Sequence, residues 1–151
     1  MMKRQRGFAL VELLITVAIT GLIITFLGTA VYQIFNATEY GNRRMLATHE
    51  LRNAAHWVCL DGQMASIASG GNELVLTLPD DSSIIYALVG SELHRIAGKS
   101  QMILARNISS LSFSVENRII TMTVTSSPEG RLNVSEKGTY KVCLRPTEKE
   151  E

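Results

Sequence analysis

The sequence has few of the residues that build catalytic and metal sites. Of its 151 residues, only three are histidine and two are cysteine. It contains no Gly-x-Ser-x-Gly nucleophile elbow, no phosphate-binding loop and no zinc motif. We therefore expect a protein that is not an enzyme, with no catalytic residue, no metal site and no cofactor.

Two small groups of polar residues leave alternatives open. His49, Arg52 and His56 recur on one helical face, which favours a solvated or subunit-contacting stripe over a catalytic one. Asp80 and Asp81 could bind calcium in an exported protein, but acidic residues are also common in hairpin turns.

The chain also lacks an excess of charge of one sign. It has 15 basic and 14 acidic residues, and three of the bases, Lys3, Arg4 and Arg6, lie in a leader without any acid. Without residues 1–7, 12 basic residues stand against 14 acidic ones, a net charge of −2. The mature chain has no basic footprint, so we predict no contact with nucleic acid.

Charge is absent altogether from Leu13 to Tyr32, a run of twenty residues. One helix of this length can cross a bilayer. The basic flank precedes the run, so the amino terminus should stay in the cytoplasm and the chain after Tyr32 should be exported. Two alternatives are a plain uncleaved anchor and a secretory signal peptide cut near Gly28-Thr29-Ala30, although its apolar region would be unusually long.

A single carboxylate, Glu12, lies just inside this apolar region. An ionisable group at membrane depth costs at least about 2–3 kcal/mol, which indicates a functional role. Together with Gly7 and Phe8, Glu12 resembles the amino-terminal signature of type IV prepilins and type II secretion pseudopilins. That signature is a short basic leader ending in Gly, Phe at the cut, and Glu as the fifth mature residue.

This resemblance implies processing and assembly. Prepilin peptidase would cut between Gly7 and Phe8 and methylate the new amine of Phe8. Glu12 would then neutralise the Phe8 ammonium of an adjacent subunit, so that two costly charges become tolerable in register. The implied partners are this peptidase, other pilin or pseudopilin subunits through the stalk helix, the inner-membrane assembly platform and the membrane. The implied location is the inner membrane, with a single pass, and then a pilus or pseudopilus.

Two further features refine the resemblance. The segment Leu51-Arg52-Asn53-Ala54-Ala55 and the order of residues from Tyr86 to Phe113 are similar to minor pseudopilins of the J or W type. Gly28 and Thr29 stand where many major pilins have a proline. We therefore predict a minor pilin or pseudopilin; the alternative is a monomeric, membrane-anchored, exported binding module.

The periodicity of apolar residues predicts an α+β fold. Small apolar residues recur at helical spacing between Ala47 and Ala65, whereas charged residues such as Glu50 and Asp61 fall mostly elsewhere. From Glu73 the period is two. We expect a long amino-terminal helix, its first half transmembrane and its second half amphipathic, with one antiparallel sheet packed on its outer half. The predicted strands are residues 74–78, 84–88, 92–97, 111–115, 120–125 and 139–144.

These patterns divide the chain into five segments. They are a basic leader (1–7), a transmembrane stalk helix (8–35), an amphipathic helix (36–68), an antiparallel β domain (69–144) and a charged disordered tail (145–151).

The two cysteines, Cys59 and Cys143, both fall in the exported part. An oxidising compartment would let them pair in a disulfide. The alternative is two separate buried thiols.

Overall fold

The computed structural model describes residues 5–146, with side chains from Ala9 onward. Residues 1–4 of the predicted leader and residues 147–151 of the predicted tail lie outside the described residues. The chain divides into two compact units between Gly41 and Asn42. We call these the first and the second unit.

One helix, α1 (Gln5–Met64), makes up the described part of the first unit and begins the second. Every side chain from Ala9 to Phe35 is exposed, although most of them are apolar. The threonine hydroxyls of this stretch donate back to the carbonyl four residues earlier, as Thr16 does to Glu12 at 2.7 Å. The helix is long and apolar enough to cross a membrane. Its internally satisfied hydroxyls suit it to hydrocarbon.

The amphipathic part of α1 ends earlier than the predicted boundary at residue 68. The helix stops at Met64, and Ile67–Ser69 forms a short strand, β1. The Ser66 amide donates to the Thr77 carbonyl at 2.8 Å, so sheet pairing replaces helical bonding there. The prediction failed because a three-residue strand is too short to show a period of two.

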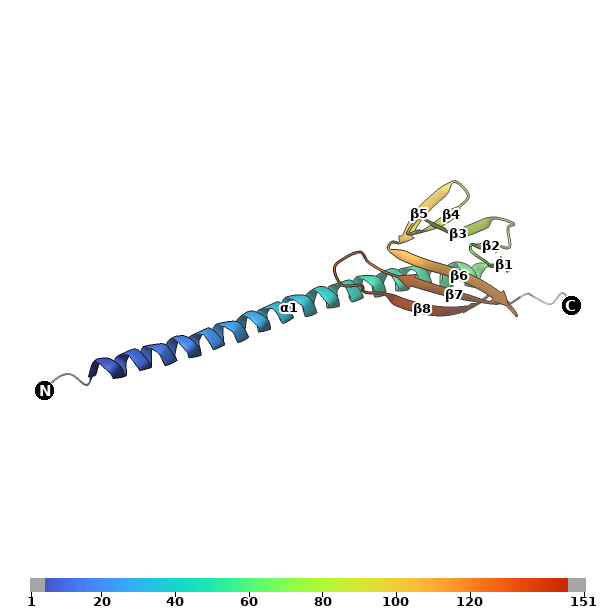
Figure 1. Ribbon diagram of the computed structural model, residues 1–151. Helices are drawn as coiled ribbons and strands as arrows, with labels where there is room; N and C mark the ends of the chain where they lie inside the picture. Colours follow the sequence, from blue (N-terminus) through green and yellow to red (C-terminus); the bar gives the residue numbers. More distant parts are fainter. Residues whose placement is uncertain (1–4, 147–151) are drawn as a thin grey trace. The chain divides into compact units, whose positions relative to one another are not determined.

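The strands form two antiparallel sheets rather than the single predicted sheet (Figure 1). The first sheet has five strands in sequence order, and the second has three. The five are β1 (Ile67–Ser69), β2 (Leu74–Thr77), β3 (Ser83–Val89), β4 (Glu92–Ala97) and β5 (Ser100–Ala105); the three are β6 (Ile108–Glu116), β7 (Ile119–Ser126) and β8 (Glu136–Cys143).

The break between the sheets falls at Asn107. Its φ of +57° lies in the left-handed region, which redirects the chain so that β6 does not continue the meander of β5. A single bridge, Gly71 to Phe113, connects the two sheets. By contrast, Asn117 and Arg118 both take positive φ in a two-residue turn, and this confirms the predicted hairpin of β6 and β7.

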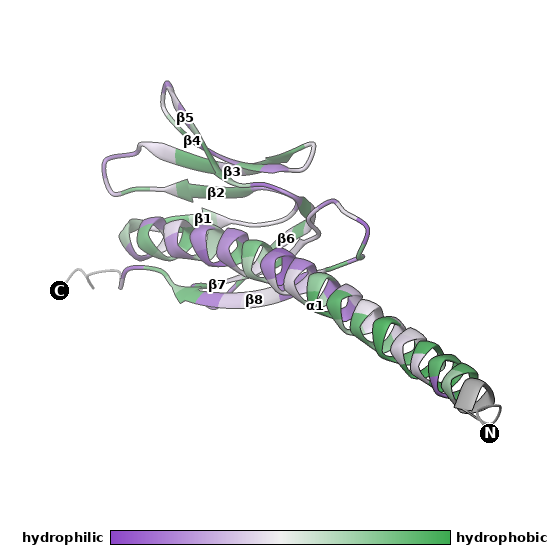
Figure 2. Ribbon diagram, turned by 90° about the vertical axis from the view of Figure 1, so that its left-hand side faces the viewer, coloured by the Kyte–Doolittle hydropathy of each residue, from purple (hydrophilic) through white to green (hydrophobic). Residues whose placement is uncertain are grey.

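The core lies between the second half of α1 and both sheets. Ala47, Leu51, Ala54 and Val58 are buried on one helical stripe, as predicted. Figure 2 shows the contrast along the helix: its ribbon is mostly apolar in the first unit and mixed in the second. The confirmed stripe and the two antiparallel sheets establish the α+β fold class.

Gly62 allows α1 to approach the second sheet closely. A Cβ atom at this position would lie 2.5 Å from Cγ1 of Val142 and 3.2 Å from Cδ1 of Ile120. The first distance would force Val142 to shift, and the second would crowd Ile120, so the absence of a Cβ at Gly62 allows the close spacing between helix and sheet.

Candidate processing and assembly site

The residues of the predicted processing site lie at the start of α1. The backbone of Gly7 and Phe8 is helical, and Glu12 follows Phe8 by four residues. Residues four apart lie on one face of a helix, about 5–6 Å apart at Cβ. A cut before Phe8 would place a new ammonium group at the positive end of the helix dipole, with Glu12 as the nearest carboxylate in sequence.

Glu12 is exposed among exposed apolar side chains. Its neighbours Val11 and Leu13 are 59% and 66% exposed. Within the part of the chain that the structure describes, the Glu12 carboxylate makes no ion pair. The described side chains, from Ala9 onward, therefore provide no counter-ion at ion-pair distance from Glu12.

A second feature of the first unit lies on the opposite helical face. Gly21 follows Glu12 by nine residues, which at 3.6 residues per turn is a rotation of about 180°. Nothing lies within 4 Å of a Cβ built at Gly21 or at Gly28. Small residues of this kind let another helix approach closely. The two faces could therefore contact two different neighbours.

The cysteines are free thiols in the structure, so the disulfide alternative is not found. Val142 is buried on the side of β8 that faces α1. Neighbouring residues of a strand point to opposite faces, which turns Cys143 away from the helix that carries Cys59. Two buried thiols are not found either, because Cys59 is half-buried and Cys143 is exposed.

The polar groups noted in the sequence remain on the surface. His49, Arg52 and His56 are all exposed, which agrees with a solvated or subunit-contacting stripe. Asp80 accepts hydrogen bonds from the hydroxyl and the amide of Ser82, at 2.6 and 3.1 Å, and these bonds lower the pKa of Asp80. Among residues 5–146, no three His, Cys, Asp or Glu side chains gather closely enough to hold a metal ion.

A buried ionic cluster at the end of α1 was missed by the sequence patterns. Asp61 is only 1% exposed and accepts two hydrogen bonds from Arg95, at 2.6 Å from Nε and 3.0 Å from Nη2. It also accepts a hydrogen bond from the Tyr86 hydroxyl, and Arg95 lies 5.2 Å from the centre of the Trp57 ring. We call these four residues the Asp61 cluster.

The Asp61 cluster has clear electrostatic consequences. Burial, followed by the hydrogen bond and charge of Asp61, raises the pKa of Tyr86 far above its ordinary value. The hydrogen bond to Asp61 also raises the pKa of Arg95. A signal was available, since Asp61 follows Val58 by three residues and so lies on the buried stripe rather than off it. The position of Asp61 on the buried stripe corrects the expectation that its charge lies off this stripe, on another face of the helix.

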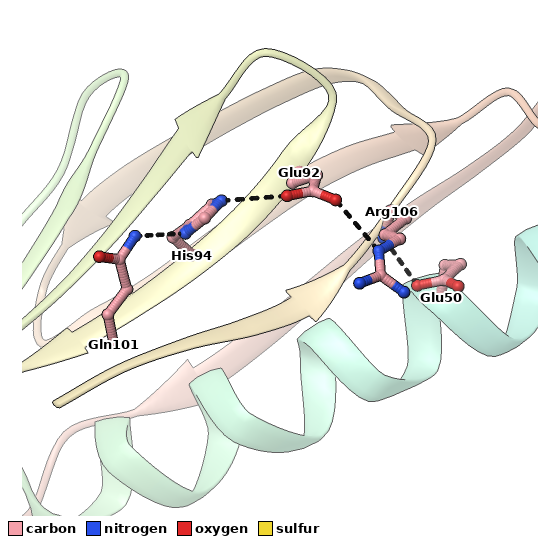
Figure 3. Close-up of polar contacts among 5 residues, drawn as sticks. All are labelled: Glu50, Glu92, His94, Gln101 and Arg106. Carbon is pink, nitrogen blue, oxygen red and sulfur yellow. Dashed lines mark hydrogen bonds and ion pairs between the residues drawn. The ribbon is translucent and has the colours of Figure 1, made fainter.

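A second polar chain ties α1 to the first sheet (Figure 3). The Arg106 amide donates to Glu50 at 2.8 Å, and its guanidinium contacts Glu92 at 3.0 Å. Glu92 lies 3.4 Å from His94, which contacts Gln101 at 2.6 Å. The Asp61 cluster thus fixes the helix to β4, and Glu50 fixes it to Arg106, directly after β5; the polar side chains of this region serve as structural contacts.

Comparison with known proteins identifies the class of the amino-terminal segment. Residues 2–28 match the family model of the prokaryotic N-terminal methylation motif. The match includes Gly7, Phe8 and Glu12, and it supports a type IV pilin-like or pseudopilin substrate of prepilin peptidase. With the exposed apolar helix, it indicates a membrane-anchored, single-span structural subunit. No curated protein and no solved structure matches the chain.

Proposed function

We propose that the chain is a minor subunit of a type IV pilus or of a type II secretion pseudopilus. The observation that carries this proposal is the methylation motif over residues 2–28, located on an exposed apolar helix. Prepilin peptidase removes residues 1–7 and methylates the amine of Phe8. The second unit folds outside the cytoplasm, and the first unit joins the fibre through an inner-membrane assembly platform.

Glu12 acts in assembly. Its carboxylate makes no ion pair with a described side chain, and its neighbours are exposed and apolar. In a fibre, it neutralises the Phe8 ammonium of an adjacent subunit. Docking in the wrong register leaves two charges unpaired in hydrocarbon, each at a cost of at least about 2–3 kcal/mol, so this pair selects the register.

Residues in both units support a minor rather than a major pilin subunit. Gly28 and Thr29 occupy the helix where many major pilins have proline, and the segments around Leu51 and Tyr86 are similar to minor pseudopilins of the J or W type. A structural role also fits the polar residues of the second unit, because Asp61 binds the helix to Arg95 of β4, and His94 contacts Glu92 and Gln101 within the first sheet. The chain is therefore assigned no catalytic activity.

The first test is the amino terminus of the mature chain. The full chain is co-expressed with a prepilin peptidase, and mass spectrometry determines its first residue. N-methylated Phe8 is expected. An intact Met1, or a start near Val31, would contradict the proposal and favour a membrane-anchored or secreted binding module.

The second test concerns Glu12. Glu12→Leu should permit insertion and cleavage yet lower incorporation into fibres about tenfold or more, since an unpaired Phe8 ammonium costs about 2–3 kcal/mol. Glu73→Leu, which removes an exposed carboxylate from the second unit, is the matched control and should assemble normally. Normal incorporation of Glu12→Leu would disprove this role.

A further inference from the structure

The strand β8 is an edge of the three-stranded sheet, whose order is β6, β7, β8. At the other edge, Phe113 of β6 exchanges two backbone hydrogen bonds of 2.9 Å with Gly71. Among the described residues, β8 pairs with β7 alone. One side of β8 thus presents backbone donors and acceptors to which an extended chain can add.

An apolar groove lies beside β8, between this strand and α1. Its volume is about 300 Å³, and most of its walls are apolar, among them Ala55 and Cys59 of the helix and Tyr140 and Val142 of the strand; His56 and Lys141 also line it. A chain added to β8 would point every second side chain toward this groove, because side chains alternate between the faces of a strand. These side chains would have to be apolar.

The other face of β8 is cationic. Lys137 and Lys141 are exposed there, four positions apart, with Thr139 midway between them. Their cross-strand neighbours on β7 are the uncharged Thr125 and Thr121. The one acid of β8, Glu136, is already paired with Arg44 at 2.8 Å. Two lysines without an acidic neighbour on β7 favour acids on an incoming strand.

Lysines on an edge strand ordinarily discourage pairing. Here Lys137 and Lys141 also discriminate between partners, because an added strand without acids would leave both lysines without an acidic cross-strand neighbour. Of the four edge strands, β1 and β5 contain no acid, whereas β6 and β8 contain one each, Glu116 and the Arg44-paired Glu136. No edge of a second copy therefore places acids beside both lysines, which favours another protein as the partner.

We propose that the free edge of β8 binds an extended segment of another protein in which apolar and acidic side chains alternate. The segment adds a fourth strand to the second sheet, with its apolar side chains in the groove and its acids beside Lys137 and Lys141. This proposal goes beyond the proposed function and does not depend on cleavage before Phe8.

The test uses the full chain in detergent micelles and three fluorescent peptides of about eight residues, the length of β8. The first alternates Val and Glu, the second alternates Val and Lys, and the third has the composition of the first with the Val and Glu residues in separate blocks. Fluorescence anisotropy measures binding. The first peptide should bind at least about tenfold more tightly than either other peptide, since several cross-strand pairs change at once.

Two matched variants locate the bound peptide. Lys141→Glu should weaken binding of the Val-Glu peptide roughly threefold or more, because an attractive cross-strand pair becomes repulsive. Lys99→Glu makes the same charge change at an exposed position in the turn between β4 and β5, and it should leave binding unchanged. Equal affinity for all three peptides, or equal losses in the two variants, would overturn the proposal.

A chemical readout checks the groove itself. In a Cys143→Ser background, Cys59 is the remaining thiol, and it lines the groove. The Val-Glu peptide at saturation should slow alkylation of Cys59 at least about fivefold, whereas the Val-Lys peptide should not. Binding without protection of Cys59 would place the peptide elsewhere and contradict the proposed mode.

Discussion

The two halves of α1 are one continuous helix with opposite surroundings. From Ala9 to Phe35 its side chains are exposed and largely apolar, whereas from Ala47 onward an apolar stripe is covered by two sheets. An apolar helix without cover in its own chain needs lipid or other helices around it. The second half is stabilised by this chain itself, and the first half by whatever surrounds it.

This comparison separates two kinds of substitution. Changes in the second half should alter the free energy of unfolding of the second unit, and changes in the first half should alter assembly. Trp57 is the only tryptophan and lies beside Arg95, so its fluorescence reports unfolding of the second unit in the full chain. The amino terminus of the mature chain reports processing of the first.

The largest expected effect on unfolding comes from Asp61→Ala. This change leaves the Arg95 guanidinium, 17% exposed, without its carboxylate, and removing one partner of a buried ion pair costs about 3–5 kcal/mol. Urea denaturation followed through Trp57 measures the loss. Glu73→Ala, at an exposed position before β2, is the control and should change little. A loss below about 1 kcal/mol would mean that the Asp61 cluster does not anchor the helix.

Tyr86→Phe should cost less, about 1.5–3 kcal/mol, because it removes one hydrogen bond to a charged group. It should also change the pH dependence. Since the pKa of Tyr86 is raised in the folded protein, its contribution is complete below pH about 10 and is lost as the pH rises further. Unfolding measured between pH 8 and 11.5 should show a steeper alkaline decline for the unchanged protein than for Tyr86→Phe. Equal slopes would argue against a buried phenol.

The same substitution at two glycines compares the halves directly. Gly62→Ala places a methyl group against Val142, which costs about 1–3 kcal/mol through overpacking. The better helix propensity of Ala offsets roughly 1 kcal/mol of this. Gly21→Ala meets no atom within 4 Å and should leave unfolding of the second unit unchanged. Destabilisation by both variants would show that the halves are not independent.

The smallest effect should come from reducing agent. The two free thiols predict a change within about 0.5 kcal/mol on reduction of the purified exported protein. A bridge between Cys59 and Cys143 would instead give a loss of about 4 kcal/mol. Urea denaturation with and without a reductant decides between these values.

The predictions from sequence succeeded where a residue pattern extends over many positions or where the turn residues are distinctive. The apolar run, the helical stripe from Ala47 to Val58 and the β6–β7 hairpin are each set by local pattern and turn chemistry. The predictions failed where the structure depends on a short element or on a contact between residues far apart in the sequence. The strand β1 has three residues, and β5 reads Ser-Gln-Met-Ile-Leu-Ala without alternation, so neither was predicted.

The candidate site divides in the same way. Gly7, Phe8 and Glu12 form a contiguous motif and could be recognised from the sequence alone. The Asp61 cluster joins residues 25 and 34 positions apart; helical periodicity places Asp61 on the buried stripe, but it does not identify Tyr86 and Arg95 as its partners. The pairing of the cysteines was undecided for a related reason, because it depends on which face of β8 carries Cys143.

In the proposed fibre, helices of other pilin-type subunits cover the first half of α1. A photo-crosslinking amino acid at Leu13, beside Glu12, tests this arrangement in cells that assemble the fibre. The arrangement predicts a covalent adduct with another chain that has a methylated amino terminus, and loss of this adduct in Glu12→Leu. Crosslinks to lipid alone, or adducts that persist in Glu12→Leu, would contradict it.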